Sequence, residues 1–138
     1  MDEEIVKREA EPQFAGLLGI EWIEDDPDRA HARVEVRDEL LQPFGLVHGG
    51  VFSTLVESVC SRSTALVTLP DGDAAMGQSI TVNFMRPITA GVVEVKARAR
   101  HRGRTTWVWD AEVRDGEDRL CALAQMTIAV RPIPRSDS

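Results

Sequence analysis

The sequence has few of the residues on which metal sites and disulfide frameworks depend. It contains only two cysteines, Cys60 and Cys121, and neither belongs to a Cys-x-x-Cys pair. We therefore favour two buried, reduced thiols, with a disulfide between them as the alternative. The three histidines, His31, His48 and His101, are scattered along the chain. This scatter argues against a metal site, because metal ligands come from clusters of such side chains.

Long apolar runs and excess positive charge are also missing. No apolar run approaches the roughly 18 residues that a membrane-spanning helix needs. Residues 1–5 carry neither a basic region nor an apolar stretch, so we expect no signal peptide and a cytoplasmic protein that does not associate with membranes. The formal net charge is −7, and an acidic chain is a poor partner for nucleic acid.

Common catalytic signatures are absent as well. The chain has no Gly-x-Ser-x-Gly elbow, His-Glu-x-x-His helix, P-loop or Gly-x-Gly-x-x-Gly fingerprint. The functions that these motifs indicate are therefore not expected. The composition is that of an ordinary globular protein, with 43% hydrophobic and 28% charged residues. A chain of 138 residues is long enough for one domain with a core, and such a domain gains stability by oligomerising.

Hydrophobic periodicity predicts one long helix among several strands. Apolar residues recur at helical spacing from Gly49 to a turn signal near 69–72, which predicts a helix of about five turns. A short apolar segment, 14–23, enters a strand. Further strands are predicted over 29–37, 75–86, 92–102, 105–114 and 120–130. We expect an α+β fold with a five- or six-stranded, mainly antiparallel sheet around the helix. A single domain would span 14–132, between an N-terminal arm, 1–13, and a flexible tail, 133–138.

The start of the predicted helix could bind a developing negative charge. Its first amide groups have no partner inside the helix, and Gly49 and Gly50 add no Cβ that would keep a ligand away from the backbone. A thioester carbonyl placed there would be stabilised as it becomes an oxyanion. The alternative is that the two glycines only form a tight turn. His48 before them could cap the helix, and Gln42 offers an amide that could polarise a carbonyl.

A polar line crosses the otherwise apolar helix. Ser53 or Thr54, Glu57, Ser61 and Thr64 follow one another at spacings of three and four residues, so they share a face. A carboxylate among apolar residues is unfavourable unless it is paired or used in chemistry. Glu57 is therefore a candidate base or nucleophile, with Ser61 placed to hold a water. The alternative is a stripe that simply faces solvent.

Basic residues alternate along one predicted strand. Lys96, Arg98, Arg100, Arg102 and Arg104 would share one strand face. This face is either solvated or a binding surface for a polyanionic ligand such as the phosphates of coenzyme A. The next strand carries Trp107 and Trp109, which we assign to the core or to an interface.

Taken together, these motifs resemble the hotdog-fold acyl-CoA thioesterases. The segment from Gln42 to Gly50, with Glu57 nine residues after His48 and Ser61 at the next turn, is similar to the 4-hydroxybenzoyl-CoA type (the Arthrobacter-like branch), the 1,4-dihydroxy-2-naphthoyl-CoA hydrolases and the phenylacetate-pathway branch. Further similarity lies in 76–79, 84–87, 105–110 and 119–132, so that roughly residues 14–132 are covered. The motif is specific because it fixes Gln, His, Gly, Glu and hydroxyl positions together.

The resemblance implies a hotdog fold and hydrolysis of an acyl-CoA, an aryl-CoA favoured, to the free acid and coenzyme A. No metal or redox cofactor is expected. Glu57 would act as nucleophile or as base for water, and the Gly49 N–H would bind the thioester oxygen. Gln42 would assist at the carbonyl, His48 would hold the loop, and Ser61 would position the hydrolytic water.

The resemblance also implies an active site at a dimer interface, with the acid from one subunit and part of the CoA site from its neighbour. We expect a homodimer at minimum and a homotetramer of paired dimers. The expected substrate- or CoA-binding residues are Arg86, Arg102, Arg104, Thr105, Gly50 and Arg135. Three alternatives stay open: a non-catalytic acyl-CoA-binding module, a hydratase or dehydratase, and a thioesterase for medium-chain fatty acyl groups.

Overall fold

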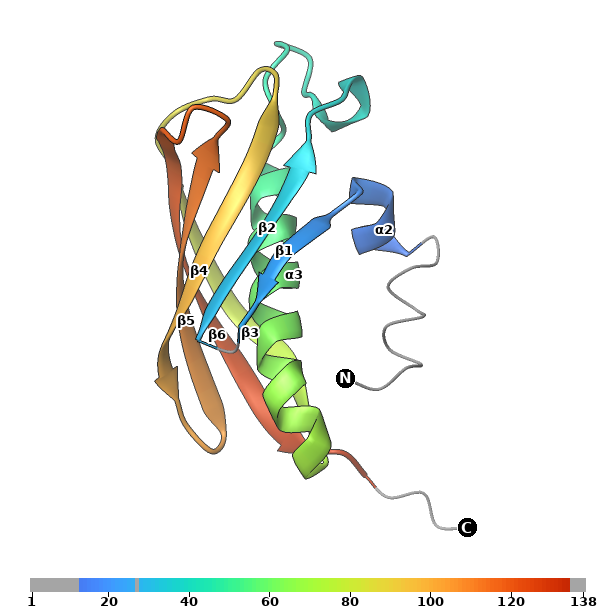
Figure 1. The fold of residues 1–138 in the computed structure, drawn as a ribbon, viewed down its shortest axis with the longest axis vertical. Helices are drawn as coiled ribbons and strands as arrows, with labels where there is room; N and C mark the ends of the chain where they lie inside the picture. The colour runs from blue at the N-terminus through green and yellow to red at the C-terminus, as the bar shows by residue number, and fades with distance from the viewer. Residues whose placement is uncertain (1–12, 27, 135–138) are drawn as a thin grey trace.

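The computed structural model describes residues 13–26 and 28–134, in which a six-stranded antiparallel sheet lies along one long helix (Figure 1). The helix is α3 (Gly49–Thr68). The strands are β1 (Glu21–Asp25), β2 (Arg29–Glu35), β3 (Asp73–Phe84), β4 (Val92–Arg102), β5 (Thr106–Asp115) and β6 (Leu120–Pro132), in the spatial order β1-β2-β4-β5-β6-β3. The predicted α+β layout is confirmed. Most of the predicted arm, and the tail beyond residue 134, lie outside the described residues.

The core fills the space between α3 and one face of the sheet, here called the inner face. Alternate residues of each central strand are buried there, and α3 contacts all of β2 to β6. Trp107 and Trp109 of β5 belong to this core, as predicted. The Trp109 indole N–H donates to the Thr64 hydroxyl at 2.9 Å. Cys60 and Cys121 are buried free thiols, which confirms the favoured interpretation of the cysteines.

The first part of the chain differs from the prediction. Residues entering the first strand form a short helix, α2 (Phe14–Leu18), which ends at Gly19 with a φ of 72°. Glycine adopts this left-handed conformation without a Cβ penalty, so the chain can turn there into β1. The two remaining short elements are the 3-10 turns η1 (Asp38–Leu40) and η2 (Leu69–Asp71).

A bulge in β4 divides the predicted basic face. The β4–β5 register shifts between Ala99 and His101, and one extra residue in a strand reverses the faces of those that follow. Arg102 therefore lies opposite Trp107, with its guanidinium 4.7 Å from the indole ring, and pairs with Asp28. Arg104 lies in the β4–β5 turn. The prediction of a single face from Lys96 to Arg104 is thus wrong beyond Arg100.

Candidate functional site

The start of α3 leaves one amide group available. The Gly50 N–H donates to Nδ1 of His48 at 2.9 Å, and the Val51 N–H donates to the His48 carbonyl oxygen at 2.9 Å. His48 is therefore the N-cap, as predicted. Because Nδ1 accepts, the neutral ring carries its proton on Nε2. The Gly49 N–H has no hydrogen-bond partner among the described residues, so it is the group free to bind an oxyanion.

A groove of about 510 Å³ opens beside this amide. Its lining includes Gln42, Gly49, Phe84, Met85 and Arg86. We call it the helix-start groove. The Phe84 ring packs on Gly49 so closely that a Cβ built there would lie 2.9 Å from Phe84 Cζ. Glycine at this position thus lets the Phe84 ring cover the helix start, in addition to leaving the backbone open to a ligand.

Gln42 lines the helix-start groove and also shapes its loop. Its backbone N–H donates to the Leu46 carbonyl at 2.7 Å, and its side-chain Oε1 accepts from the Phe44 N–H. Within the described part of the chain, its Nε2 amide makes no hydrogen bond, so its two N–H donors stay available. This arrangement suits the expected role of Gln42 near a substrate carbonyl.

Glu57 lies against the edge strand β3. A Cβ built on Gly77 would come 3.7 Å from Glu57 Oε1 and 2.6 Å from the terminal methyl of Met126. The β3–β6 register shifts between Gly77 and Ser79, so the strand bulges beside the carboxylate. Glu57 is exposed in this single chain. A Cβ at position 77 would displace the Met126 methyl, whereas it would be in ordinary van der Waals contact with the acid.

Glu57 and Ser61 share a second groove, of about 390 Å³, here called the mid-helix groove. Its other lining residues include Phe14, Trp22 and Arg62, and the Arg62 guanidinium lies 4.3 Å from the centre of the Trp22 ring. The sequence did not single out these three residues. The available signal was that Arg62 and Glu57 are the only charged residues in the twenty of α3.

The predicted polar line does not form one continuous site. Thr64 is fully buried, donates to the Cys60 carbonyl at 2.8 Å and accepts the bond from Trp109. Ser53 and Thr54 donate to backbone carbonyls one turn earlier, those of Gly49 and Gly50. Thr54, Glu57 and Ser61 are the members of the line that border the mid-helix groove.

The two grooves are separate within one chain. Gly49 and Glu57 are eight residues apart on the same helix, which corresponds to about 12 Å along its axis. A thioester carbonyl bound to the Gly49 amide therefore stays out of reach of the same chain's Glu57. The structure brings Gln42, His48, Gly49 and Arg86 together at one place, and Glu57 with Ser61 at another.

Three of the expected CoA-binding residues, Arg102, Arg104 and Thr105, lie at the far end of the sheet. Figure 1 shows the β4–β5 turn at the end opposite to the start of α3 and to the loop that carries Arg86. In this turn the Thr105 carbonyl accepts from Arg131 at 2.6 Å and from the Val130 N–H at 2.9 Å. Arg102 and Arg104 flank the turn. Arg135 lies outside the described residues, so its role stays a prediction.

The strongest electrostatic features lie away from the grooves. Hydrogen bonds from the Arg119 backbone and side chain hold the pKa of Asp115 below its usual value, in the turn between β5 and β6. Burial raises the pKa of the Cys60 thiol. No three His, Cys, Asp or Glu side chains of the described ranges gather closely enough to hold a metal ion. Among the described helices, none is long and apolar enough to cross a membrane.

Comparison with known proteins shows which family the chain resembles. Residues 44–122 match the model of the thioesterase superfamily. The chain is 34% identical over 114 residues to a 1,4-dihydroxy-2-naphthoyl-CoA hydrolase of Listeria monocytogenes (83% of this chain and 92% of the relative). It is 32% identical over 113 residues to a proofreading thioesterase of Cronobacter turicensis (82% of each). The crystal structure of a Haemophilus influenzae thioesterase superposes with a TM-score of 0.87 at 29% identity, over 100% of this chain and 96% of that one.

Proposed function

Because the chain belongs to the thioesterase superfamily, with a hotdog fold, and is a thioester hydrolase, we propose that it hydrolyses an aryl-CoA at sites that two copies build together. One copy would supply the helix-start groove, and the other would supply Glu57 and Ser61. The observation that carries this proposal is the separation of the Gly49 amide from Glu57 on one helix.

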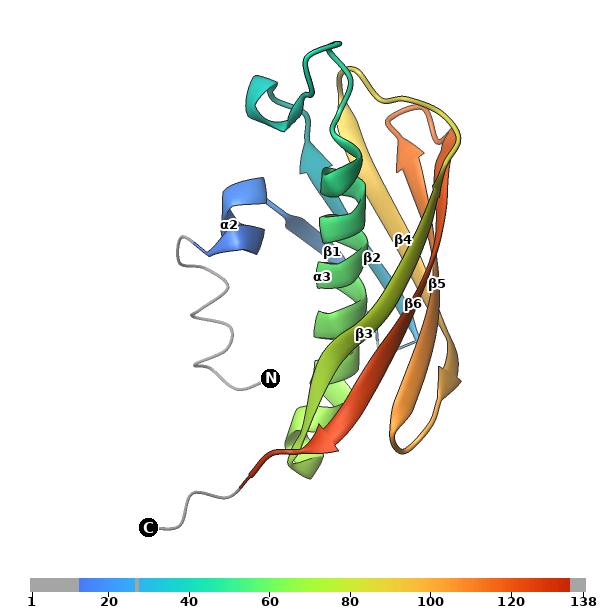
Figure 2. The same ribbon diagram turned by 180° about the vertical axis from the view of Figure 1, so that it is seen from behind.

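The exposed edge strand β3 supports such a pairing. It is twelve residues long, and among the described strands its one hydrogen-bonded neighbour is β6. Its exposed apolar side chains are Met76, Ile80 and Phe84, at 51%, 36% and 56% exposure. A long apolar edge of this kind is a template for pairing with another strand. Figure 2 shows β3 beside α3, so a partner bound at this edge would also meet the helix.

Antiparallel pairing of two β3 strands would complete the site. If the pair is centred between Ile80 and Thr81, Gly77 of each copy lies opposite Phe84 of the other, because both are equally distant from that centre. Phe84 packs on Gly49 and Gly77 borders Glu57, so one copy's oxyanion donor comes beside the other's carboxylate. The same pairing turns the partner end for end and brings its β4–β5 turn toward Arg86.

The groups that this pairing brings together suggest the steps of thioester hydrolysis. Substrate binds with its thioester oxygen on the Gly49 N–H, near the Gln42 amide. Glu57 either attacks the carbonyl carbon, giving a mixed anhydride and releasing the CoA thiolate, or removes a proton from an attacking water. Ser61 positions the water, and His48 keeps the helix start in place. Arg86, Arg102, Arg104 and Thr105 would hold the CoA phosphates, and Gly50 and Arg135 would border them.

Two observations support an aromatic acyl group. Phe14 and Trp22 line the mid-helix groove beside Glu57, and aromatic side chains pack well on planar rings. The Listeria monocytogenes relative is named for a naphthoyl-CoA substrate.

A thiol-release assay tests the proposal. The panel contains 4-hydroxybenzoyl-CoA, 1,4-dihydroxy-2-naphthoyl-CoA, phenylacetyl-CoA and linear acyl-CoAs, and a chromogenic thiol reagent reports free CoA. The chain's own two thiols are buried, so we expect a low background. Fast turnover of one aromatic member is the expected result. Preference for linear substrates would contradict the aromatic assignment, and binding without turnover across the panel would contradict the proposed site.

A single turnover in oxygen-18 water separates the two roles of Glu57. Label that appears in the Glu57 carboxylate after one turnover indicates the anhydride route. Label that appears only in the product acid indicates direct attack by water.

A further inference from the structure

The mid-helix groove carries a positive charge that the proposed chemistry does not use. Both Glu57 and Arg62 border this groove, and they are the two charged residues of α3. Glu57 has a proposed role in the attack on the thioester, whereas Arg62 has none. In ligand pockets, a few charged or polar groups fix the orientation of the ligand and give specificity. Arg62 is therefore a candidate for selecting the acyl group.

The acid and the cation lie on opposite sides of the mid-helix groove. Arg62 follows Glu57 by five positions, which places the two residues about 140° apart around the helix and about 7.5 Å apart along its axis. The helix surface between them carries small side chains, those of Ser58, Ser61 and Ala65. Glu57 lies against β3, and Arg62 lies against Trp22 of β1. These strands are the two edges of the sheet, and Figure 2 shows α3 between them. The groove thus crosses the helix from the acid to the cation.

Trp22 orients the guanidinium of Arg62. The indole lies on the α3 side of β1, because Trp22 is the register partner of Ala32, which is buried on the inner face. The guanidinium carbon is 4.3 Å from the centre of the Trp22 ring, a cation–π contact. Stacking uses the face of a guanidinium, whereas its N–H donors point outward in its plane. The contact therefore fixes the plane in which Arg62 can donate to a ligand in the groove.

The chemistry of Arg62 favours a carboxylate as that ligand. A guanidinium can donate two parallel N–H bonds to the two oxygens of a carboxylate, and such charge-assisted bonds are stronger than neutral ones. A hydroxyl group offers one oxygen and no charge, so it uses only part of this donor set. Because the reacting carbonyl must lie at Glu57, a carboxylate bound to Arg62 must lie on the far side of the acyl group.

We propose that Arg62 selects aryl-CoA substrates whose ring carries a carboxylate on the side away from the thioester. The inference rests on the proposed function and narrows its substrate class, because it takes the mid-helix groove as the acyl-binding site. The ring crosses the small residues of α3 beside Phe14 and Trp22, and its carboxylate binds the Arg62 guanidinium. The ring keeps this carboxylate apart from Glu57, and the positive charge of Arg62 offsets the repulsion between the two anions.

Two substrates of nearly equal shape test the proposal. The acyl groups of 4-carboxybenzoyl-CoA and 4-carbamoylbenzoyl-CoA differ in that one ends in a carboxylate and the other in a neutral amide. Benzoyl-CoA serves as the unsubstituted reference, and thiol release gives kcat/KM for each substrate. The wild-type chain should prefer the carboxylate to the amide by about 10- to 100-fold, the range expected for hydrogen bonds to a charged group.

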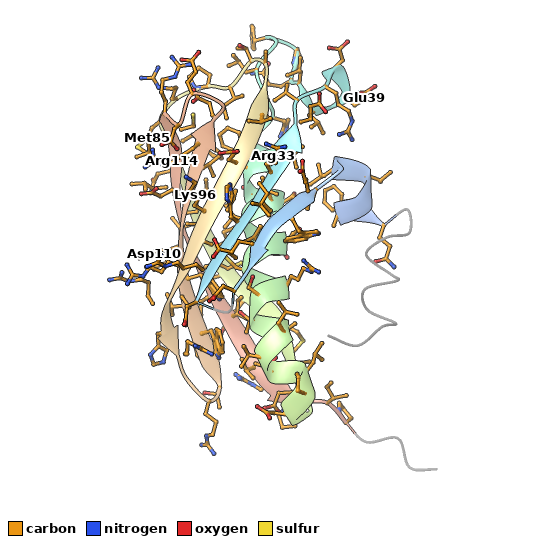
Figure 3. All side chains as sticks on the ribbon, in the orientation of Figure 1. Arg33, Glu39, Met85, Lys96, Asp110 and Arg114 are labelled. Carbon is orange, nitrogen blue, oxygen red and sulfur yellow. The ribbon has the colours of Figure 1, made fainter. Side chains whose placement is uncertain are left out.

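Removal of the positive charge should abolish this preference. Arg62→Met keeps a long side chain over Trp22 but has no N–H donor, so the ratio of the two kcat/KM values should fall to about one. Arg62→Lys keeps the charge without the planar fork and should retain part of the preference. The matched control is Arg33→Met, because Arg33 pairs with Glu21 at 2.9 Å on the face of β2 opposite to buried Ala32 (Figure 3). This control should keep the wild-type ratio.

Several results would overturn the inference. A wild-type chain that hydrolyses benzoyl-CoA but treats the carboxylate and the amide alike would contradict it and leave the proposed function in place. Faster wild-type hydrolysis of 4-hydroxybenzoyl-CoA than of 4-carboxybenzoyl-CoA would do the same. Equal losses for all three substrates in folded Arg62→Met and Arg62→Lys would assign Arg62 a packing role. No turnover of any aryl-CoA would contradict the proposed function and this inference with it.

Circular dichroism shows whether each variant is folded. If Arg62→Met does not fold, the ratio measured in Arg62→Lys decides: a ratio below that of wild type supports the inference, and an unchanged ratio contradicts it.

Discussion

The two grooves on α3 divide one set of reacting groups between them. The helix-start groove holds an unpaired backbone N–H, an amide and an arginine, all of which bind an anionic or polarised ligand. The mid-helix groove holds the Glu57 carboxylate, the Ser61 hydroxyl and two aromatic rings, and the proposed mechanism uses the carboxylate and this hydroxyl for the attack and for positioning water. In the proposed mechanism, the helix-start groove stabilises the oxyanion that forms when the group in the mid-helix groove, or its activated water, attacks the thioester. If the proposed function is correct, this division means that two copies of the chain together complete each site.

The largest expected effect is in the mid-helix groove. Glu57→Ala removes the group proposed to attack the thioester or activate water, so kcat should fall on the order of 10³-fold or more. CoA affinity should remain, because the proposed phosphate contacts lie elsewhere. Thiol release and CoA titration on the same sample measure both quantities. Normal hydrolysis by this variant would contradict the mechanism.

The helix-start groove is tested by deleting one N–H. Proline is tolerated at the first position of a helix, and His48 before it already has the extended φ and ψ of −60° and 134° that proline requires. Gly49→Pro should lower kcat/KM about 10²- to 10³-fold, the usual effect of losing an oxyanion donor.

Gly49→Ala is the control for that substitution. It adds a Cβ against Phe84, as proline does, but keeps the N–H. Equal activity of the two variants would show that the crowding of Phe84, and not the lost donor, limits the reaction.

A smaller effect is expected at Ser61. Its hydroxyl is proposed to hold the water, and one neutral hydrogen bond contributes about 1 kcal/mol, so Ser61→Ala should lower kcat by roughly 5- to 10-fold. Ser61→Thr should keep most of the activity because it retains the hydroxyl. Steady-state kinetics with a single aryl-CoA measure both variants. An inactive Ser61→Thr that is still folded would point to a packing role instead.

The smallest effect on catalysis is expected at the β5–β6 turn. The bonds from Arg119 lower the pKa of Asp115, so the carboxylate stabilises the folded state above the pKa it has when unfolded. This stabilisation is lost as the pH falls through the lower, folded-state pKa. Asp115→Asn should lower the melting temperature at neutral pH and leave kcat unchanged. The difference from wild type should shrink in acid, which thermal denaturation across pH 2–7 would measure.

Sequence patterns predicted most of the fold, because the spacing of apolar residues indicates which face of a helix or strand is buried. The spacing of Val51, Leu55 and Val59 placed α3, and the alternation in β2, β5 and β6 placed strands. The bulges at Ala99 and Gly77 could not be predicted in this way, because one inserted residue leaves the composition and the local alternation nearly unchanged. For that reason Arg102 was assigned to the wrong face.

The sequence identified the residues of the candidate site but did not predict how they are arranged in space. Gln42, His48, Gly49, Glu57 and Ser61 stood out because polar residues and glycines interrupt an apolar segment. Their division between two grooves depends on the rise of α3 and on the path of β3, which no local pattern encodes. Phe14, Trp22 and Arg62 were missed because they meet only when α2 and β1 fold back onto the helix.

Mixing two inactive variants tests the composite site most directly. Glu57→Ala and Gly49→Pro chains, each nearly inactive alone, are co-expressed with different tags. If each site takes its acid from one copy and its oxyanion donor from the other, a mixed dimer has one site with both defects and one intact site. Random mixing should then restore about a quarter of wild-type activity, and purified mixed dimers about half, since a two-fold dimer carries two equivalent sites. No recovery in purified mixed dimers would contradict the account, because it would mean that each chain carries its own complete site.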